Sequence, residues 1–218
     1  GDQNTGVGSL ALTKLTTGGN NTGIGTVALT ALTTGSSNTA VGDNALAANT
    51  TASNNTAVGA SALLSNTTGT NHVAVGANAL DANTTGTDNT ALGRSSLGAN
   101  STGRFNTAVG YESLLSNTTA DNNVAVGRVA LTANTTGTEN TAVGTSAMDA
   151  CTTGSYNVGM GMNALGALTT ASFNTGVGTG VMASITTGNH NTGMGDTTLD
   201  SNTTGIQNVA IGNNALTA

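Results

Sequence analysis

Apolar and polar positions recur along the whole chain with a fixed period of 17 residues. The unit reads Asn-Thr-Ala-Val-Gly-x-x-Ala-Leu-x-x-Asn-Thr-Thr-Gly-x-x, and we number its positions one to seventeen from the first Asn. Such a repeat indicates one structural unit per copy, each stacked on the last. Thirteen copies follow one another without insertion or deletion, beginning at Asn4, Asn21, Asn38, Asn55, His72, Asn89, Asn106, Asn123, Asn140, Asn157, Asn174, Asn191 and Asn208.

The apolar positions predict short strands. Positions two to four and eight to nine are apolar or β-branched, and Gly and Asn, which readily form tight corners, bracket them. A helix is disfavoured because 17 residues are not a whole number of 3.6-residue turns, and Gly and Thr are poor helix formers. We expect an all-β fold, a parallel β-solenoid of thirteen 17-residue coils about 4.8 Å apart, which gives a rod about 60 Å long.

Position five is Gly in every copy, and we expect these residues to be structural turn glycines. They are Gly8, Gly25, Gly42, Gly59, Gly76, Gly93, Gly110, Gly127, Gly144, Gly161, Gly178, Gly195 and Gly212. The chain starts at position fifteen of one unit and stops at position eleven of another. We therefore predict that residues 1–218 form a single repeat array, a fragment of a longer fibre or adhesin.

Two apolar faces are expected on each coil. Neighbouring strand residues point to opposite sides, so positions three and four cannot enter the same core, and positions eight and nine repeat this small-then-large pattern. We expect positions four and nine to share a face distinct from that of position three, and the spacing leaves open which of the two faces the interior. The second face needs a partner, which favours association with copies of the same chain.

Positions three and twelve vary together. Position twelve is Leu or Ile where position three is Gly, in the copies with Gly6, Gly23, Gly159 and Gly176, and it is Asn where position three is Ala in six others. Large residues replace small ones where space allows, so we expect these two positions to touch. Gly193, paired with Asn202, breaks the rule.

Composition and charge exclude several functions. Only 6% of the 218 residues are charged and 2% aromatic, there is no Pro, and the net charge is −6 with four basic residues. Nucleic-acid binding is therefore not expected, because too few cations are present to neutralise phosphates. No apolar stretch approaches the roughly 20 residues that span a bilayer, so this segment should not insert into a membrane.

No residue pattern supports catalysis, a metal or a cofactor. The two histidines, His72 and His190, should lie about seven coils, roughly 33 Å, apart, too far to share a metal ion. Carboxylates form no column that would indicate calcium-binding repeats. The single cysteine, Cys151, occupies position twelve and is expected to be a packed core thiol. We expect no enzymatic activity.

Asn-Thr-Thr at positions twelve to fourteen matches the glycosylation sequon in seven copies, yet Leu or Ile occupies the same column in others. We therefore interpret these asparagines as inward ladders: Asn49, Asn66, Asn83, Asn100, Asn117, Asn134 and Asn202. Threonine ranks also suggest ice binding as an alternative function. Adjacent positions thirteen and fourteen should point opposite ways, which leaves at most one Thr rank per face.

Exposed aromatic and basic residues at variable positions are candidate surface contacts. At position six, stacking would align Arg94, Tyr111 and Arg128 in a cation–π sandwich. At position seventeen it would align Tyr156, Phe173 and His190. The candidate binding residues are Arg94, Arg104, Phe105, Tyr111, Arg128, Tyr156 and Phe173.

The segments Asn208–Ala218 (NVAIGNNALTA) and Asn123–Ala133 (NVAVGRVALTA) resemble the head repeats of trimeric autotransporter adhesins. The Asn-Thr-Ala-Val-Gly-x-x-Ala-Leu pattern is also similar to repeats in bacteriophage tail-fibre proteins. The resemblance implies a left-handed parallel β-roll, assembled as a trimer and used for attachment outside the cell.

We thus expect a structural or attachment segment of an extracellular or virion fibre, either an adhesin head or a tail fibre. Its location would be extracellular, on the cell surface or on the virion. Its partners would be copies of itself and a host-surface receptor or matrix component. The alternatives are an ice-binding β-solenoid and a self-stacking extracellular filament subunit.

Overall fold

The computed structural model describes residues 1–217, in which every regular element is a strand and no helix occurs. Each strand covers positions two to four of one copy. The bounds are β1 Thr5–Val7, β2 Thr22–Ile24, β3 Thr39–Val41, β4 Thr56–Val58, β5 Val73–Val75, β6 Thr90–Leu92, β7 Thr107–Val109, β8 Val124–Val126, β9 Thr141–Val143, β10 Val158–Met160, β11 Thr175–Val177, β12 Thr192–Met194 and β13 Val209–Ile211. The predicted all-β parallel solenoid is confirmed.

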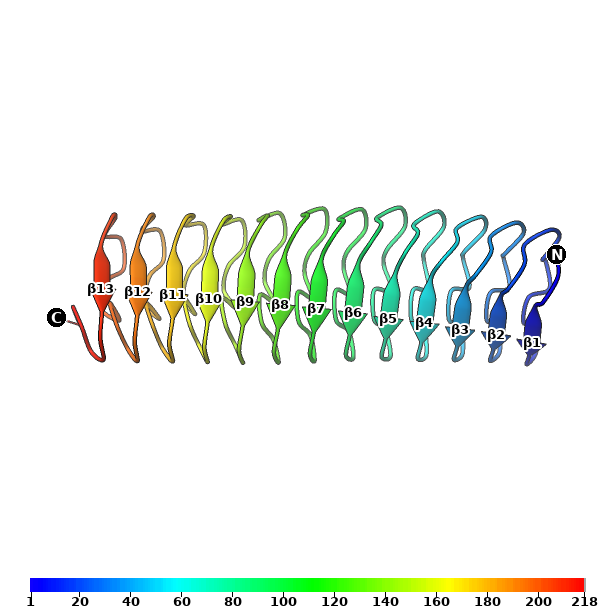
Figure 1. Cartoon of the computed structure of the whole chain (residues 1–218), viewed down its shortest axis with the longest axis horizontal. Coiled ribbons are helices and arrows are strands. Elements are labelled where there is room, and N and C mark those ends of the chain that lie inside the picture. The colour runs from blue at the N-terminus through cyan, green and yellow to red at the C-terminus, as the bar shows by residue number, and fades with distance from the viewer. Residues whose placement is uncertain (218) are drawn as a thin grey trace. The chain divides into compact units, whose positions relative to one another are not determined.

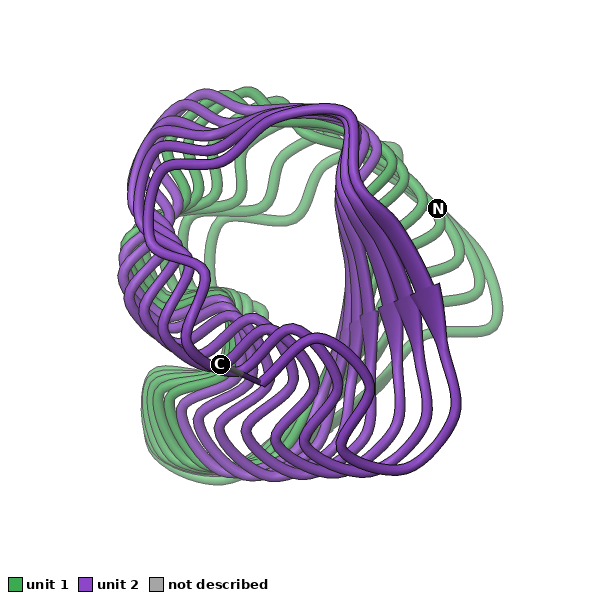
Figure 2. Ribbon diagram, turned by 90° about the vertical axis from the view of Figure 1, so that its left-hand side faces the viewer, with its two compact units in different colours: residues 1–106 green, residues 107–218 purple. Residues whose placement is uncertain are grey.

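The chain divides into two compact units, residues 1–106 (unit 1) and 107–218 (unit 2), shown in green and purple in Figure 2. In unit 1, β1 to β6 pair in chain order, and in unit 2, β7 to β13 do the same (Figure 1). All pairs are parallel with a register of one repeat: Ala40 lies opposite Ala57 in unit 1, and Ala125 opposite Ala142 in unit 2.

Backbone hydrogen bonds between successive coils continue beyond the strands. The Leu29 N–H donates to the Ala45 carbonyl at 3.1 Å, and the Thr33 N–H donates to the Thr50 carbonyl at 2.8 Å. Since the chain has no Pro, every residue after the first retains an N–H for this ladder. Pairing thus extends through the turns as well as the short strands.

Left-handed backbone conformations shape the corners of each coil. All thirteen position-five glycines have φ between +121° and +143°. A methyl group on Gly25 would lie 2.3 Å from the carbonyl oxygen of Gly42 in the next coil, so both the conformation and the close approach require glycine. Positions seven, nine and seventeen also have positive φ, mostly with non-glycine residues; Leu29, for example, is at 53°.

The interior is lined by positions one, three, eight, nine and twelve. In the fourth copy these are Asn55, Ala57, Ala62, Leu63 and Asn66, and each is 0% exposed. The expected common face of positions four and nine is therefore wrong. Position nine is buried beside position three, because positive φ at positions seven and nine breaks the alternation assumed for a strand.

The residues closest to position three also differ from expectation. A methyl group on Gly23 would lie 3.2 Å from Cγ of Leu12, which is at position nine of the preceding coil. The nearest atoms around Gly6, Gly23 and Gly159 come from positions eight and nine, and position twelve is not among them. Both positions face the same interior, and the expected direct contact between positions three and twelve stays a prediction.

Gly193 follows the same packing rule. A methyl group there would lie 2.9 Å from Cγ2 of Val181, where most copies carry the smaller Ala at position eight. Val181 and the neighbouring Met182 are both fully buried. These larger neighbours, rather than position twelve, explain why position three remains Gly in this copy.

Two amide ladders run through the interior. In the position-one column, the Asn38 backbone N–H donates to Oδ1 of Asn21 at 3.0 Å, and Asn38 Nδ2 donates to the Ala52 carbonyl at 2.9 Å. In the position-twelve column, Asn83 Nδ2 donates to Oδ1 of Asn66 at 2.8 Å. The position-twelve asparagines are fully buried from Asn49 to Asn134 and Asn202 is partly buried, which confirms the inward ladder over the glycosylation reading.

Candidate interaction surface

The first and last residues of every strand, at positions two and four, point away from the interior. We call these two columns the strand face. The middle residue is buried in β2 to β13, whereas position four remains partly exposed: Ile24 is 39% and Met160 41% accessible. Position two is Thr or Val, and position four is Val, Ile, Leu or Met in all thirteen copies. The strand face is therefore an apolar surface with threonine along one edge.

No charged residue occupies the strand face. The four basic and ten acidic residues all occur at other positions: Asp2, Lys14, Asp43, Asp81, Asp88, Arg94, Arg104, Glu112, Asp121, Arg128, Glu139, Asp149, Asp196 and Asp200. Depletion of charge on an exposed apolar surface is typical of the buried centre of a protein interface. Sequence reasoning identified the position-four column but assigned it the wrong companion, position nine.

The two threonine positions of each coil differ in their hydrogen bonding. At position thirteen the hydroxyl of Thr16 donates to the Thr33 carbonyl at 2.8 Å, and that of Thr33 donates to Thr50 at 3.0 Å. Position fourteen is exposed from Thr17 to Thr204, and within residues 1–217 its hydroxyls have no hydrogen-bond partner in the chain. One rank of threonine hydroxyls, at position fourteen, therefore faces solvent.

The candidate residues at position six are exposed in both units. Arg94 belongs to unit 1, whereas Tyr111 and Arg128 belong to unit 2. The cation–π sandwich of these three side chains stays a prediction. At position sixteen, Arg104 lies with Cζ 5.8 Å from the centre of the Phe105 ring, close enough for a cation–π contact.

Three rings at position seventeen form a stack in unit 2. The ring centres of Tyr156 and Phe173 are 4.9 Å apart, as are those of Phe173 and His190, and each pair is parallel within 1°. Tyr156 is 46% and Phe173 49% exposed. Because the rings cover one another's faces, only their edges and the two outer faces remain open to a partner.

Side chains that could bind a metal ion are not clustered among the described residues. No three His, Cys, Asp or Glu side chains of this range lie close enough to hold a metal ion. Burial raises the pKa of the Cys151 thiol to about 11. This thiol lies at the end of a run of position-twelve asparagines, which leaves the buried Oδ1 of Asn134 without a hydrogen-bond donor.

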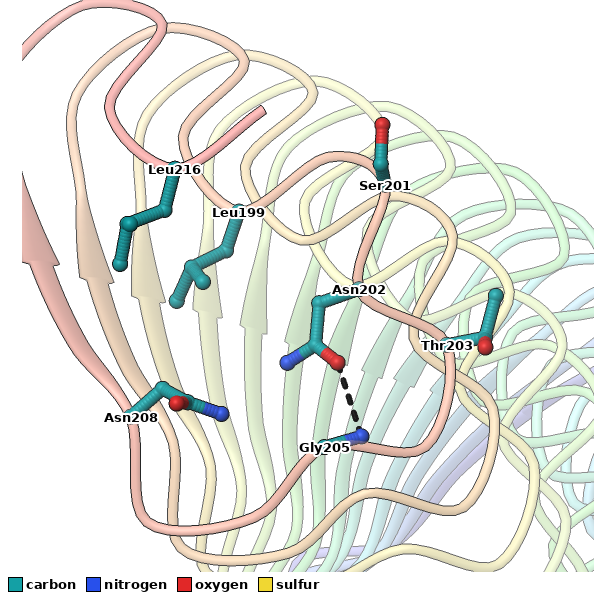
Figure 3. Close-up of a pocket in the computed structure, with 7 residues that line it drawn as sticks. All are labelled: Leu199, Ser201, Asn202, Thr203, Gly205, Asn208 and Leu216. Carbon is teal, nitrogen blue, oxygen red and sulfur yellow. Dashed lines mark hydrogen bonds between the residues drawn. The ribbon is translucent and has the colours of Figure 1, made fainter. Parts of the chain in front are cut away.

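A pocket in the last coils is lined in part by the interior positions one, nine and twelve. Figure 3 shows Leu199, Leu216 and Asn208 pointing toward the coil interior, and Oδ1 of Asn202 accepting a hydrogen bond from the Gly205 N–H at 2.8 Å. The lining residues are Leu199, Ser201, Asn202, Thr203, Gly205, Asn208 and Leu216. This hollow is the solenoid core seen from its last coil, and it has no distinct chemistry.

Comparison with protein-family models, curated proteins and solved structures found no match for this chain. The resemblance to adhesin heads and tail fibres therefore stays a prediction. No helix in the part of the chain that the structure describes could cross a membrane.

Proposed function

We propose that the chain is a structural and attachment segment of an extracellular or virion fibre, without enzymatic activity. The observation that carries this proposal is the uncharged, apolar strand face, repeated in every coil on the outside of a solenoid whose own core is already formed by other positions. Such a surface has no role within the chain. Its repetition is best explained by contact with further copies of the same chain.

Three copies assembled around their strand faces are the arrangement that we favour. The number three and the left-handed coil come from the resemblance to adhesin heads and tail fibres. Charged and aromatic residues at positions six, sixteen and seventeen would then remain on the outer surface, where they could contact a host-surface receptor or matrix component. The fibre would serve as a rod that holds or forms the receptor-binding surface.

The length of the array sets the strength of this association. Strands of three residues in seven coils give unit 2 a strand face of roughly 10 Å by 34 Å, or about 340 Å² per copy. A stable interface buries about 800 Å² per partner. The strand face of one unit is less than half of this area, so an assembly would also have to bury residues that flank the strands.

Light scattering on the purified chain tests this function. Val126→Asp places a charge on the strand face, and Thr136→Asp places the same charge on the exposed position fourteen of the same coil. We expect a trimer for the native chain and for Thr136→Asp, with dissociation only for Val126→Asp. A folded native monomer at micromolar concentration would refute self-association, and a broad distribution of larger masses would favour a filament.

An ice-binding surface is a second candidate, supported by the exposed threonines of position fourteen. These threonines occupy position fourteen in all twelve copies that reach it, although their hydroxyls make no hydrogen bond within the described chain. Measurement of thermal hysteresis separates the two functions. A freezing-point depression that disappears when several of these threonines are replaced would favour ice binding over a fibre segment.

A further inference from the structure

His72 replaces asparagine in the position-one ladder. Asparagine holds this position in the other twelve copies. The imidazole is only 1% exposed, so the ladder continues through this coil with a titratable group in place of an amide. His190, in contrast, lies at position seventeen and is exposed.

The imidazole reproduces both hydrogen bonds of the amide that it replaces. In the preceding coil, Oδ1 of Asn55 accepts the His72 backbone N–H at 3.0 Å, and Nδ2 of Asn55 donates to the Gly69 carbonyl at 3.0 Å. Nδ1 of His72 likewise accepts the Asn89 backbone N–H at 3.2 Å, and Nε2 lies 2.7 Å from the Gly86 carbonyl. These partners assign a neutral ring that carries its proton on Nε2.

A second proton on the His72 ring is incompatible with these two hydrogen bonds. It would bind Nδ1, the atom that accepts the Asn89 N–H, and would set two donors against each other in a site closed to water. No new hydrogen bond replaces the one that is lost. The Nε2 proton already points at the Gly86 carbonyl, and the other neighbour of Nε2, the amide nitrogen of Asn83 at 3.1 Å, is itself a donor. An asparagine at the same place would be unaffected, because its amide does not titrate.

We propose that His72 makes the fifth copy an acid-sensitive opening point of unit 1: protonation of its imidazole removes the acceptor of the Asn89 N–H and loosens the pairing of β5 with β6. Coils of a solenoid contact only their neighbours, so loss at one coil opens the stack locally. The fibre segment would thereby respond to mild acid at one defined place.

The pH range follows from the surroundings of the ring. Burial lowers the pKa of His72 below its ordinary value of 6.5, and hydrogen bonds with Gly86 and Asn89 and the charge of Asp88 oppose this shift. Among the described residues, Asp88 is the titratable group whose charge acts on the ring, and Arg104 of the next coil acts in turn on Asp88. The unfolded chain thus binds the proton first, so the stabilisation is complete above pH 6.5 and is lost as the pH falls toward the folded-state pKa.

Hydrogen exchange of the full chain tests the proposal, with His72→Asn restoring the asparagine of the other copies and His190→Asn as the matched control. Between pH 7.5 and pH 5.0, after correction for intrinsic exchange, we expect the peptide that contains Asn89 to lose protection in the native chain, because the folded-state pKa of His72 lies below its unfolded value. His190→Asn should behave like the native chain, and His72→Asn should retain its protection. The equivalent peptide of unit 2 around Asn174, whose N–H is bound by Asn157, should stay protected in all three proteins.

Equal loss of protection in His72→Asn, or no loss in the native chain, would overturn the proposal. The ring can also be followed directly by nuclear magnetic resonance in the native chain. A titration midpoint of His72 below 6.5 is expected. A midpoint at or above 6.5 would show that protonation is compatible with the folded ladder.

Discussion

Ala125 and Val126 are neighbours on β8, yet they belong to two regions that repeat with equal strictness for different reasons. Ala125 is fully buried and lies opposite Ala142 of the next coil, within the solenoid core. Val126 is only partly buried and lies on the strand face, outside the solenoid core. The interior columns repeat because only these side chains pack in the solenoid core. Repetition of the strand face instead indicates contact with a partner outside the chain.

The largest expected effect separates these two regions. Ala125→Asp buries an unpaired charge and should destabilise the chain by about 4 kcal/mol or more. Val126→Asp should change the free energy of unfolding of the coil itself by less than about 1 kcal/mol while it weakens association. Circular dichroism and light scattering, measured on both variants, check the distinction. Equal loss of folded structure in the two variants would mean that the strand face belongs to the core.

Removal of one ladder amide should have the next largest effect. Asn140 accepts the Asn157 backbone N–H at 3.0 Å and donates to the Gly154 carbonyl at 2.8 Å, both in the buried interior. Asn140→Ala leaves these groups unpaired and should cost about 2 to 4 kcal/mol. Urea unfolding measures this cost. Thr179→Ala, at an exposed position, is the control and should stay within about 0.5 kcal/mol of the native chain.

The packing of position three predicts a smaller, coupled effect. Gly193→Ala should cost about 1 to 3 kcal/mol, because the new methyl group would lie 2.9 Å from Cγ2 of Val181. In the background of Val181→Ala, which restores the common residue of position eight, this cost should vanish. A double-mutant cycle measures the coupling. Additive costs would place the source of strain elsewhere than at Val181.

The thiol of Cys151 should react more slowly in the folded chain than in the unfolded chain. Burial raises its pKa from 9.0 to about 11, so the reactive thiolate is about 100-fold less abundant in the folded chain. A thiol reagent at pH 8 should therefore react at least 100-fold more slowly with the native protein than with the protein in urea. Comparable rates in the two states would show that the interior around position twelve is open to solvent.

The repeat predicted the fold because a strict period determines the register in which neighbouring strands pair. A constant spacing of 17 residues brings Ala40 opposite Ala57, and the pairing is parallel as expected. The glycine of position five, Gly25 for example, could be recognised because its conformation admits few other residues. Asparagine at position one in twelve of the thirteen copies is a further signal of an inward ladder.

The orientation of position nine could not be predicted from alternation. Leu63 is fully buried with φ at 52°, and Ser61 two residues before it is at 57°. Leucine rarely adopts this conformation, which costs roughly 1 to 2 kcal/mol, and only burial of the side chain compensates for it. The stack of Tyr156, Phe173 and His190 was predictable from the period. The molecule that this stack would contact cannot be predicted, because its sequence is not part of this chain.

The mass of the native assembly in solution is the most direct test of the claim that the strand face is made to be covered by copies of the same chain. Light scattering at micromolar concentration should give three chain masses for the native protein and a lower mass for Val126→Asp, with the circular dichroism of both unchanged. A native protein that is fully folded and has the mass of one chain would contradict the claim, because the strand face would then be stable in water without a partner.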